Sequence, residues 1–206
     1  MSNAIRIHHF PKSGHAHRAL VFVKLAGIAH ETVFVDLAAG AHKSPEFLAM
    51  NPNGQVPVLE DGDVVVSDSN AILVYLARTY APDWMPKDAV GEAEVQKWLT
   101  LAAGEIAFGS CAARLITVFG APLDVEFAAA TAAKAMQKLE QGLTGQEWLV
   151  GDRPTIADVA AYSYTAHAPE GNVSLDPYPN VQAWIARFEA LEGFEPMPAT
   201  AVGLAA

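Results

Sequence analysis

Alternating and helically spaced apolar positions divide the start of the chain into short elements. Residues 4–8 alternate, with Ile5 and Ile7 on one face, which predicts a strand. Residues 14–26 carry apolar positions at helical spacing, and Gly27 fits a C-terminal stop. The stretch ETVFVDL is typical of a second strand. Strand, helix and strand in this order predict a parallel pair with a right-handed crossover.

A hairpin and a further helix complete the first predicted domain. The stretch VPVLEDGDVVVSD places Asp61-Gly62 between two valine-rich runs, which is the pattern of a β-hairpin. A helical segment led by Pro45 precedes it, and a helix follows it with one side formed by Ala71, Ile72, Tyr75, Leu76 and Thr79. The order β-α-β-α-β-β-α predicts a mixed four-stranded sheet with helices packed on it.

The pattern changes in the segment YAPDWMPKDAVGEAE, where prolines and acids interrupt the periodicity as in a linker. Beyond it the apolar spacing is helical, with long patterns at 91–118 and 123–142 and a capping-box start at Thr155 and Asp158. The expected fold class is an α/β domain followed by an all-α domain. The expected boundaries are 1–80 for the first domain, 81–90 for the linker and 91–206 for the helical domain.

Composition and charge narrow the class of protein. The 206 residues are 51% hydrophobic and carry a formal net charge of −10, which disfavours a nucleic-acid or anionic-membrane partner. Charge or glycine interrupts the apolar segments before the roughly 18 residues of a membrane span, and the N-terminus lacks a signal-peptide pattern. We therefore expect a cytoplasmic protein with no membrane partner. The single cysteine, Cys111, fits a reducing compartment and a buried structural position.

The turn between the first strand and the first helix holds the candidate chemistry. The stretch HFPKSGHAHR places Ser13 at the helix start, where serine is a favoured cap. His8 and His9 point to opposite faces of a strand, and His15 and His17 lie about 200° apart on a helix, so no metal site is predicted. The sequence contains no G-x-S-x-G, which argues against a nucleophile elbow.

Four stretches, in order and over nearly the whole chain, resemble the cytosolic glutathione transferases of the serine type (phi-, zeta- or tau-like, or a bacterial relative). They are SGHAHRALVFVKLAGI, with Ser13 five residues before Arg18, then HKSPEFLAMNPNGQVPVLEDGD, SDSNAILVYLA, and WLVGDRPTIADVAAY with the later YPNVQAWIARFEAL. The resemblance implies a thioredoxin-like, glutathione-binding first domain and a helical domain that contributes the second-substrate pocket. It also implies glutathione as co-substrate with no other cofactor, and a two-fold homodimer.

The resemblance gives Ser13 a catalytic role. Thioredoxin-like redox proteins place Cys-x-x-Cys at this turn, whereas Ser13 and Ala16 stand there in this chain, so a ligand must supply the thiol. A thiol with a pKa near 8.5 is about 3% ionised at pH 7, and lowering that pKa by about 2 takes roughly 2.7 kcal/mol. A hydroxyl donor contributes about 1.5–3 kcal/mol to an anion and a helix N-terminus about 0.3–1 kcal/mol. Ser13 is therefore expected to donate a hydrogen bond to the glutathione sulfur, and helix capping alone is the alternative.

The segment GQVPV is expected to pair with the cysteine moiety of glutathione. A cis Val56–Pro57 bond would turn the Val56 N–H and C=O outward, where they could bond a peptide as a strand does. An ordinary edge-strand proline is the alternative. By the same resemblance, Gln55 is a further polar contact.

The two charged ends of glutathione have their own expected partners. The resemblance implies that His42 and Lys43 meet the glycine carboxylate and that Asp68 and Ser69, at a helix start, meet the γ-glutamyl group. Many family members carry Glu where Asp68 stands. Two solvated loop residues and a plain N-cap cluster are the alternatives. His15 could face the sulfur, the second substrate or solvent.

The expected function is a glutathione transferase of the detoxification type, in which the thiolate attacks a small hydrophobic electrophile. Another glutathione-dependent reaction (disulfide reduction, peroxide reduction, dehalogenation or isomerisation) and a non-enzymatic scaffold stay open as alternatives. Trp98, Phe108 and Ile116 border the second-substrate pocket or belong to the core. The dimer interface is expected at Ala71–Ala77 and on the first long helix.

Overall fold

The computed structural model describes residues 4–206, so residues 1–3 of the expected first domain lie outside the described residues. The described chain forms two compact units. Unit 1 extends to Pro82 and includes Glu192–Pro198, and unit 2 comprises Asp83–Leu191 and Ala199–Ala206. The assignment of Glu192–Pro198 to unit 1 differs from the expected helical domain 91–206, because apolar periodicity does not report where a non-helical segment packs.

Unit 1 is built on a mixed four-stranded sheet, which confirms the predicted fold class of this half. Its strands β1 (Ile5–His9), β2 (His30–Phe34), β3 (Val58–Asp61) and β4 (Val64–Ser67) are arranged in the order β2-β1-β3-β4. β2 runs parallel to β1, whereas β3 is antiparallel to both β1 and β4. The predicted hairpin joins β3 and β4, and Gly62 takes the positive φ of 59° that its turn requires.

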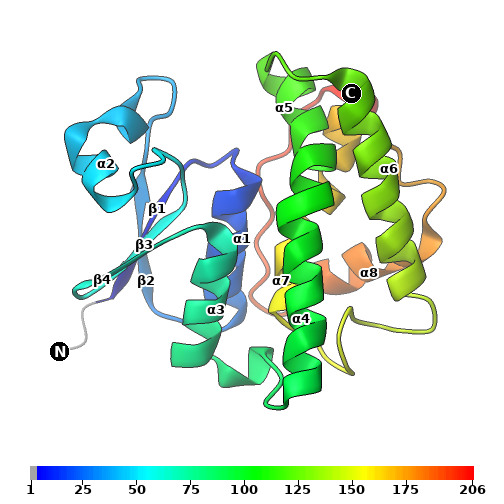
Figure 1. Ribbon diagram of the computed structural model, residues 1–206, viewed down its shortest axis with the longest axis horizontal. Coiled ribbons are helices and arrows are strands. Elements are labelled where there is room, and N and C mark those ends of the chain that lie inside the picture. Colours follow the sequence, from blue (N-terminus) through cyan, green and yellow to red (C-terminus); the bar gives the residue numbers. More distant parts are fainter. Residues whose placement is uncertain (1–3) are drawn as a thin grey trace. The chain divides into compact units, whose positions relative to one another are not determined.

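The helices α1 (Gly14–Leu25) and α3 (Ser69–Thr79) pack against each other on one face of this sheet, and α2 (Pro45–Met50) lies on the other (Figure 1). Neighbouring residues of β1 serve the two faces, as the pleat requires. Ile7 is fully buried, while the His8 ring meets Phe47 of α2 edge-on at a centroid distance of 6.1 Å. Helices therefore cover both faces of the sheet. This packing holds in place the strand ends at which the candidate site lies.

The segment Glu192–Pro198, called the C-terminal strap below, is held on α1. The His17 Nε2–H donates to the Glu195 backbone oxygen at 2.8 Å, and the Lys24 ammonium pairs with the Glu195 carboxylate. Gly193 has a φ of +85°, and a Cβ there would lie 2.8 Å from the Lys24 carbonyl oxygen. The strap therefore lies close against the helix that begins at Ser13.

Unit 2 is all-helical, which confirms the predicted fold class of this half. Its first long helix consists of α4 (Ala89–Leu101), the π-helical stretch η3 (Ala102–Cys111) and α5 (Ala112–Phe119). The other helices are α6 (Val125–Gly142), α7 (Ile156–Ala166) and α8 (Pro179–Glu189), with the short 3₁₀ turns η4 (Ala168–Gly171) and η5 (Gly203–Ala205). The predicted capping box at Thr155 and Asp158 begins α7, which is almost entirely buried.

A close backbone crossing joins the two longest helices of unit 2. A Cβ on Gly109 of η3 would lie 2.5 Å from the Ala132 backbone nitrogen of α6, so only glycine fits there. Cys111 lies two residues further along the same helix and is buried, as expected for a structural residue.

The long helix Ala89–Phe119 is apolar and long enough to cross a membrane, with a mean hydropathy of 1.4 over its best window. Glu105 and Arg114 still interrupt the apolar run of this helix, as the sequence predicts, although its mean hydropathy stays high. In the structure 44% of the window is buried within the protein, and a core helix of a soluble protein meets the same criterion. Arg114 of this helix is buried in an ion pair.

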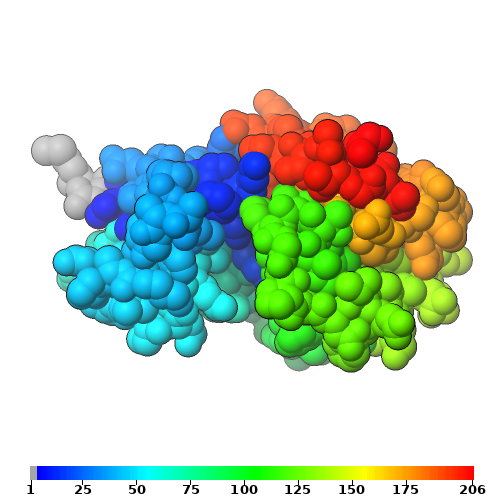
Figure 2. All heavy atoms as spheres, turned by 90° about the horizontal axis from the view of Figure 1, so that it is seen from above, coloured from blue at the N-terminus to red at the C-terminus, as the bar shows by residue number. Residues whose placement is uncertain are grey.

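That ion pair forms the Glu170 hub, defined by Arg114, His167, Glu170 and Thr200. Arg114 Nε donates to Glu170 Oε2 at 2.7 Å, and both side chains are buried. His167 Nδ1 and the Thr200 backbone N–H donate to Oε1, and the Thr200 hydroxyl donates to Oε2 at 2.6 Å. The hub holds the C-terminal tail, Ala199–Ala206, which lies at the surface and is red in Figure 2.

Candidate functional site

Ser13 lies at the N-terminus of α1, immediately after the turn that follows β1. Its Oγ accepts a hydrogen bond from the Ala16 backbone N–H at 3.2 Å, so Ser13 is the helix cap. A hydroxyl has two lone pairs and one proton, and capping uses only a lone pair. The proton is compatible with donation to an anion, so capping and activation do not exclude each other.

The sheet register brings the predicted site residues to one edge of unit 1. Val58 of β3 pairs with His8 of β1 and with Ser67 of β4. The segments that follow β1, precede β3 and follow β4 therefore start beside one another. These segments carry Ser13, Val56, Pro57, Asp68 and Ser69.

The Val56–Pro57 peptide bond is cis, as predicted. Pro57 is buried and Val56 half-buried, directly before β3. The Asn51 side-chain amide donates to the Gln55 backbone oxygen at 2.8 Å and fixes this loop. Gln55 itself is exposed.

His42 and Lys43 lie in the short 3₁₀ turn η1 (Ala41–Lys43). The Lys43 Nζ lies 3.5 Å from the backbone oxygens of Asn53 and Gly54, so the ammonium reaches the loop that leads to Gln55. Gly54 has a φ of +59°, and a Cβ there would lie 2.6 Å from the Lys43 Nζ. Among residues 4–206, His42 Nδ1 has no hydrogen-bond partner although it is buried. The structure thus places the Lys43 ammonium beside the loop that carries Gln55.

Asp68 and Ser69 begin α3, and their side chains differ in surroundings. Asp68 has a φ of +74° and is exposed, and its Oδ1 caps the backbone N–H groups of Asn70 and Ala71 at 2.9 Å each. Ser69 is buried, and its Oγ accepts from Arg18 Nη1 at 2.8 Å. The Asp68 carboxylate faces solvent, whereas the Ser69 hydroxyl is engaged inside the protein.

Arg18 is the residue whose role the sequence does not reveal, beyond its spacing from Ser13. Its side chain is 1% exposed and bonds both Ser69 and the Asn70 side-chain oxygen at 2.8 Å. A charged residue among the apolar positions of the first helix was the available signal. Arg18 ties α1 to the start of α3.

His15 turns toward α3. Its Nδ1 lies 3.2 Å from Ser69 Oγ and 3.5 Å from Arg18 Nη1. Burial, followed by the positive charge of Arg18, lowers the pKa of His15 from 6.5 to about 3. His15 is therefore neutral at working pH.

Comparison with known proteins gives the family. Residues 4–78 match the glutathione S-transferase N-terminal domain, and residues 124–192 match the glutathione S-transferase C-terminal domain. A glutathione S-transferase 3 from Zea mays is 32% identical over 206 residues, which cover 93% of this chain and 91% of the relative. The chain belongs to the glutathione S-transferase family.

Solved structures of this family agree with the assignment. A glutathione S-transferase from Pseudomonas fluorescens has a TM-score of 0.89 at 29% identity, over 95% of this chain and 99% of that one. A glutathione transferase homologue from Drosophila mojavensis, solved with bound glutathione, has a TM-score of 0.83 at 26% identity, over 93% and 89%. The glutathione S-transferase fold thus accounts for both units.

The residues considered for a second-substrate pocket of the glutathione S-transferase separate into two groups. Trp98 is buried against Gly142, and Ile116 packs on the small residues of a core cluster. Phe108 is 62% exposed. It is one of several exposed apolar side chains along η3, α5 and the start of α6, namely Phe108, Leu115, Phe119, Leu123, Val125 and Phe127.

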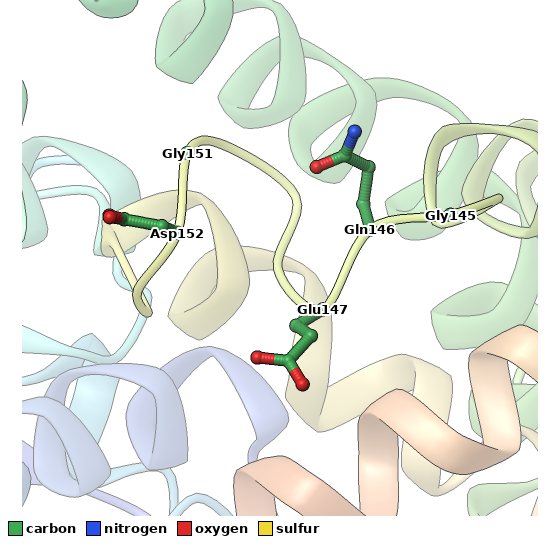
Figure 3. A pocket seen from close by; sticks show the side chains of 5 residues that line it. All are labelled: Gly145, Gln146, Glu147, Gly151 and Asp152. Carbon is green, nitrogen blue, oxygen red and sulfur yellow. The ribbon is translucent and has the colours of Figure 1, made fainter.

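A hollow of about 470 Å³ lies in the loop between α6 and α7 of unit 2 (Figure 3). Gly145, Gln146, Glu147, Gly151 and Asp152 line it. None of the predicted site residues is among them. Its two carboxylates would repel the carboxylates of a peptide such as glutathione, so it is no candidate for the glutathione site.

Proposed function

We propose that this chain is a glutathione transferase that binds glutathione at the sheet edge of unit 1 and directs its thiolate at a small hydrophobic electrophile. Family membership over both units supports the reaction class. The relative from Drosophila mojavensis holds glutathione. The observation that carries the proposal is the cap geometry of Ser13, whose oxygen accepts from Ala16 while its proton stays compatible with a sulfur partner.

Ser13 is the proposed catalytic residue. Its hydroxyl donates to the glutathione sulfur and the N-terminus of α1 adds a positive field, together about 2–4 kcal/mol. The roughly 2.7 kcal/mol needed to lower the thiol pKa by about 2 lies within that range. The sulfur is thereby held mostly as thiolate, which is the nucleophile.

The tripeptide is bound through its charges and its backbone. Lys43, with His42 beside it, meets the glycine carboxylate, while Gln55 and the Val56 backbone meet the cysteine moiety. At the other end, Asp68 meets the ammonium of the γ-glutamyl group and the N-terminus of α3 meets its carboxylate, through the Ser69 position. The exposure of Lys43, Gln55 and Asp68 supports their availability to a ligand.

The second substrate is a hydrophobic electrophile, and the protein acts in detoxification as a cytoplasmic homodimer. The exposed apolar side chains of η3, α5 and α6 support an apolar substrate. Ala71 and Val74 lie outside the α3 core face, so the Ala71–Ala77 segment stays the proposed dimer contact, with the first long helix. A panel of chloronitroaromatic, peroxide, disulfide and haloacid substrates would identify the electrophile.

The decisive experiment is a thiolate titration of bound glutathione in Ser13→Ala, followed by ultraviolet absorbance. The thiol pKa should rise by about 1–2, corresponding to the lost hydroxyl donor. Ser44→Ala is the matched control, because Ser44 caps α2 with the same 3.2 Å contact to a backbone N–H. Both variants lose about 0.5–2 kcal/mol of capping stability, but only Ser13→Ala should alter the thiol. An unchanged thiol pKa in Ser13→Ala would refute the activating role, and wild-type protein that fails to bind glutathione would refute the transferase.

A further inference from the structure

The C-terminal strap, Glu192–Pro198, lies along α1 within unit 1 and runs toward the N-terminus of that helix (Figure 1). At the last turn of α1, a Cβ on Gly193 would lie 2.8 Å from the Lys24 carbonyl oxygen. Two residues further on, the Glu195 backbone oxygen bonds the side chain of His17, which ends the first turn of α1. The strap therefore follows most of the helix in the antiparallel direction.

The bond between the strap and the first turn of α1 has a defined direction. A carbonyl oxygen can only accept, so His17 Nε2 carries a proton and donates it to the Glu195 oxygen at 2.8 Å. His17 is 7% exposed, so water has little access to this bond. Pro196 follows Glu195, and a residue before proline is restricted to extended backbone conformations. The sequence thus presents the acceptor to His17 in a restricted conformation.

The first turn of α1 needs support from outside the helical ladder. The first N–H groups of a helix have no intrahelical partner, and helix ends fray. Ser13 supplies part of this support, because its Oγ accepts from the Ala16 N–H at 3.2 Å and its backbone oxygen accepts from the His17 N–H at 2.8 Å. The His17 side chain binds the same turn to the strap. A single residue thus joins the strap to the turn that orients the Ser13 hydroxyl.

We propose that His17 is a positioning residue for the glutathione thiolate, which acts by clamping the C-terminal strap onto α1 and thereby holding Ser13 in its capped conformation. The inference rests on the proposed function and deepens it, because it adds a segment from the end of the chain to the support of the activating hydroxyl. His17 does not touch glutathione in this role. The contact with the sulfur is made by Ser13.

The test compares His17→Ala with His17→Gln in the thiolate titration of bound glutathione. His17→Ala removes the donor, and the thiol pKa should rise by about 0.5–1, the effect of one hydrogen bond to a backbone oxygen. His17→Gln carries an amide N–H near the position of Nε2, so its thiol pKa should stay within about 0.2 of wild type. His30→Ala is the matched control with no expected shift, because the His30 ring also bonds a backbone oxygen of unit 1, that of Ile28, at 2.8 Å.

Gly193→Ala perturbs the strap without changing α1. The new Cβ would lie 2.8 Å from the Lys24 carbonyl oxygen, so the strap must move away from the helix and the thiol pKa should rise as in His17→Ala. Gly27→Ala is the control for this variant. Gly27 also has a positive φ, +63°, but a Cβ there would meet nothing within 4 Å, so the thiol pKa should match wild type.

Three results would overturn the inference. An unchanged thiol pKa in His17→Ala would mean that the strap bond does not support Ser13. A rise in His17→Gln as large as in His17→Ala would mean that the donor is irrelevant. An unchanged thiol pKa in Gly193→Ala would mean that the strap itself plays no part.

A readout without glutathione separates this inference from the proposed function. The Ala16 N–H, which bonds Ser13 Oγ, should exchange with deuterium about 3–10-fold faster in His17→Ala than in wild type, and at nearly the wild-type rate in His17→Gln. Equal exchange rates in wild type and His17→Ala would also overturn the inference. If exchange responds as expected while the protein does not bind glutathione, the clamp stands and the proposed function fails.

Discussion

Replacing Glu170 by Gln tests the Glu170 hub. Glu170 is buried at 2% exposure and accepts hydrogen bonds from Arg114, His167 and Thr200. Burial acts to raise its pKa, but the hydrogen bonds from Thr200, His167 and Arg114 outweigh burial and lower that pKa from 4.5 to about 2. The substitution keeps the shape of the side chain and removes the charge that compensates Arg114.

The pKa of Glu170 and the general cost of breaking a buried ion pair indicate a similar loss of stability. The difference between a pKa of 4.5 and one of about 2 corresponds to about 3 kcal/mol of folding free energy at pH 7. Removing one partner of a buried ion pair costs about 3–5 kcal/mol, because the remaining charge stays buried. We therefore expect Glu170→Gln to lose about 3–5 kcal/mol of unfolding free energy at pH 7.

The loss should also depend on pH. The folded pKa is lower than the unfolded one, so the stabilisation is complete well above pH 4.5 and is lost as the pH falls toward 2. At pH 3.5 the contribution of the Glu170 charge should have fallen to about 2 kcal/mol, so the gap between wild type and variant narrows by about 1 kcal/mol.

Urea denaturation followed by circular dichroism measures both effects. Glu147→Gln serves as the control, because Glu147 is an exposed carboxylate of the same unit, and its loss should stay within about 0.5 kcal/mol. The double variant Glu170→Gln/Arg114→Met should lose less unfolding free energy than the sum of the losses of the two single variants. Two results would contradict this account of the hub. One is a loss of unfolding free energy below about 1 kcal/mol for Glu170→Gln, and the other is a difference between wild type and variant that is the same at pH 7 and pH 3.5.

Three further changes have defined outcomes. Asp158→Ala removes a buried carboxylate that accepts four hydrogen bonds, and should cost about 3 kcal/mol or more in urea denaturation; a loss below about 1 kcal/mol contradicts this. Gly54→Ala places a Cβ 2.6 Å from a lysine nitrogen and should weaken glutathione binding about 3–10-fold, whereas Gly62→Ala, which has the same φ of +59° but open space, should not; equal affinities would contradict the contact. Asp61→Asn should lower the pKa of Tyr80 from about 12 toward 10 in a phenolate titration, because the phenol loses its carboxylate acceptor, and an unmoved titration would rule out that acceptor.

The features that the sequence predicts are those set by local chemistry. The cap at Ser13, the capping box at Thr155 and the hairpin at Asp61-Gly62 depend on residues close in the chain, and all three are present. The sheet edge also follows, because alternation and element order determine which strand ends meet. The sequence therefore predicts that the segments carrying Ser13, Val56, Pro57, Asp68 and Ser69 meet at one edge of the sheet.

The features that the sequence does not reveal depend on contacts between distant segments. Nothing in the spacing of His15 indicates that its ring meets Ser69, 54 positions away, and nothing in the helical periodicity of the long helix shows that Arg114 pairs with Glu170. The same holds for Glu195, whose backbone oxygen bonds His17 across most of the chain. Such contacts are fixed by tertiary packing, which a pattern of apolar positions does not encode.

The C-terminal strap means that unit 1 is not one continuous piece of polypeptide. A fragment that stopped at Pro82 would lack the backbone oxygen that accepts from His17 and the carboxylate that pairs with Lys24. A chimaera that joined this sheet to a different set of helices would also have to include Glu192–Pro198. The sheet unit is therefore complete only when the chain has been made almost to its end, although the sheet and the helices belong to separate compact units.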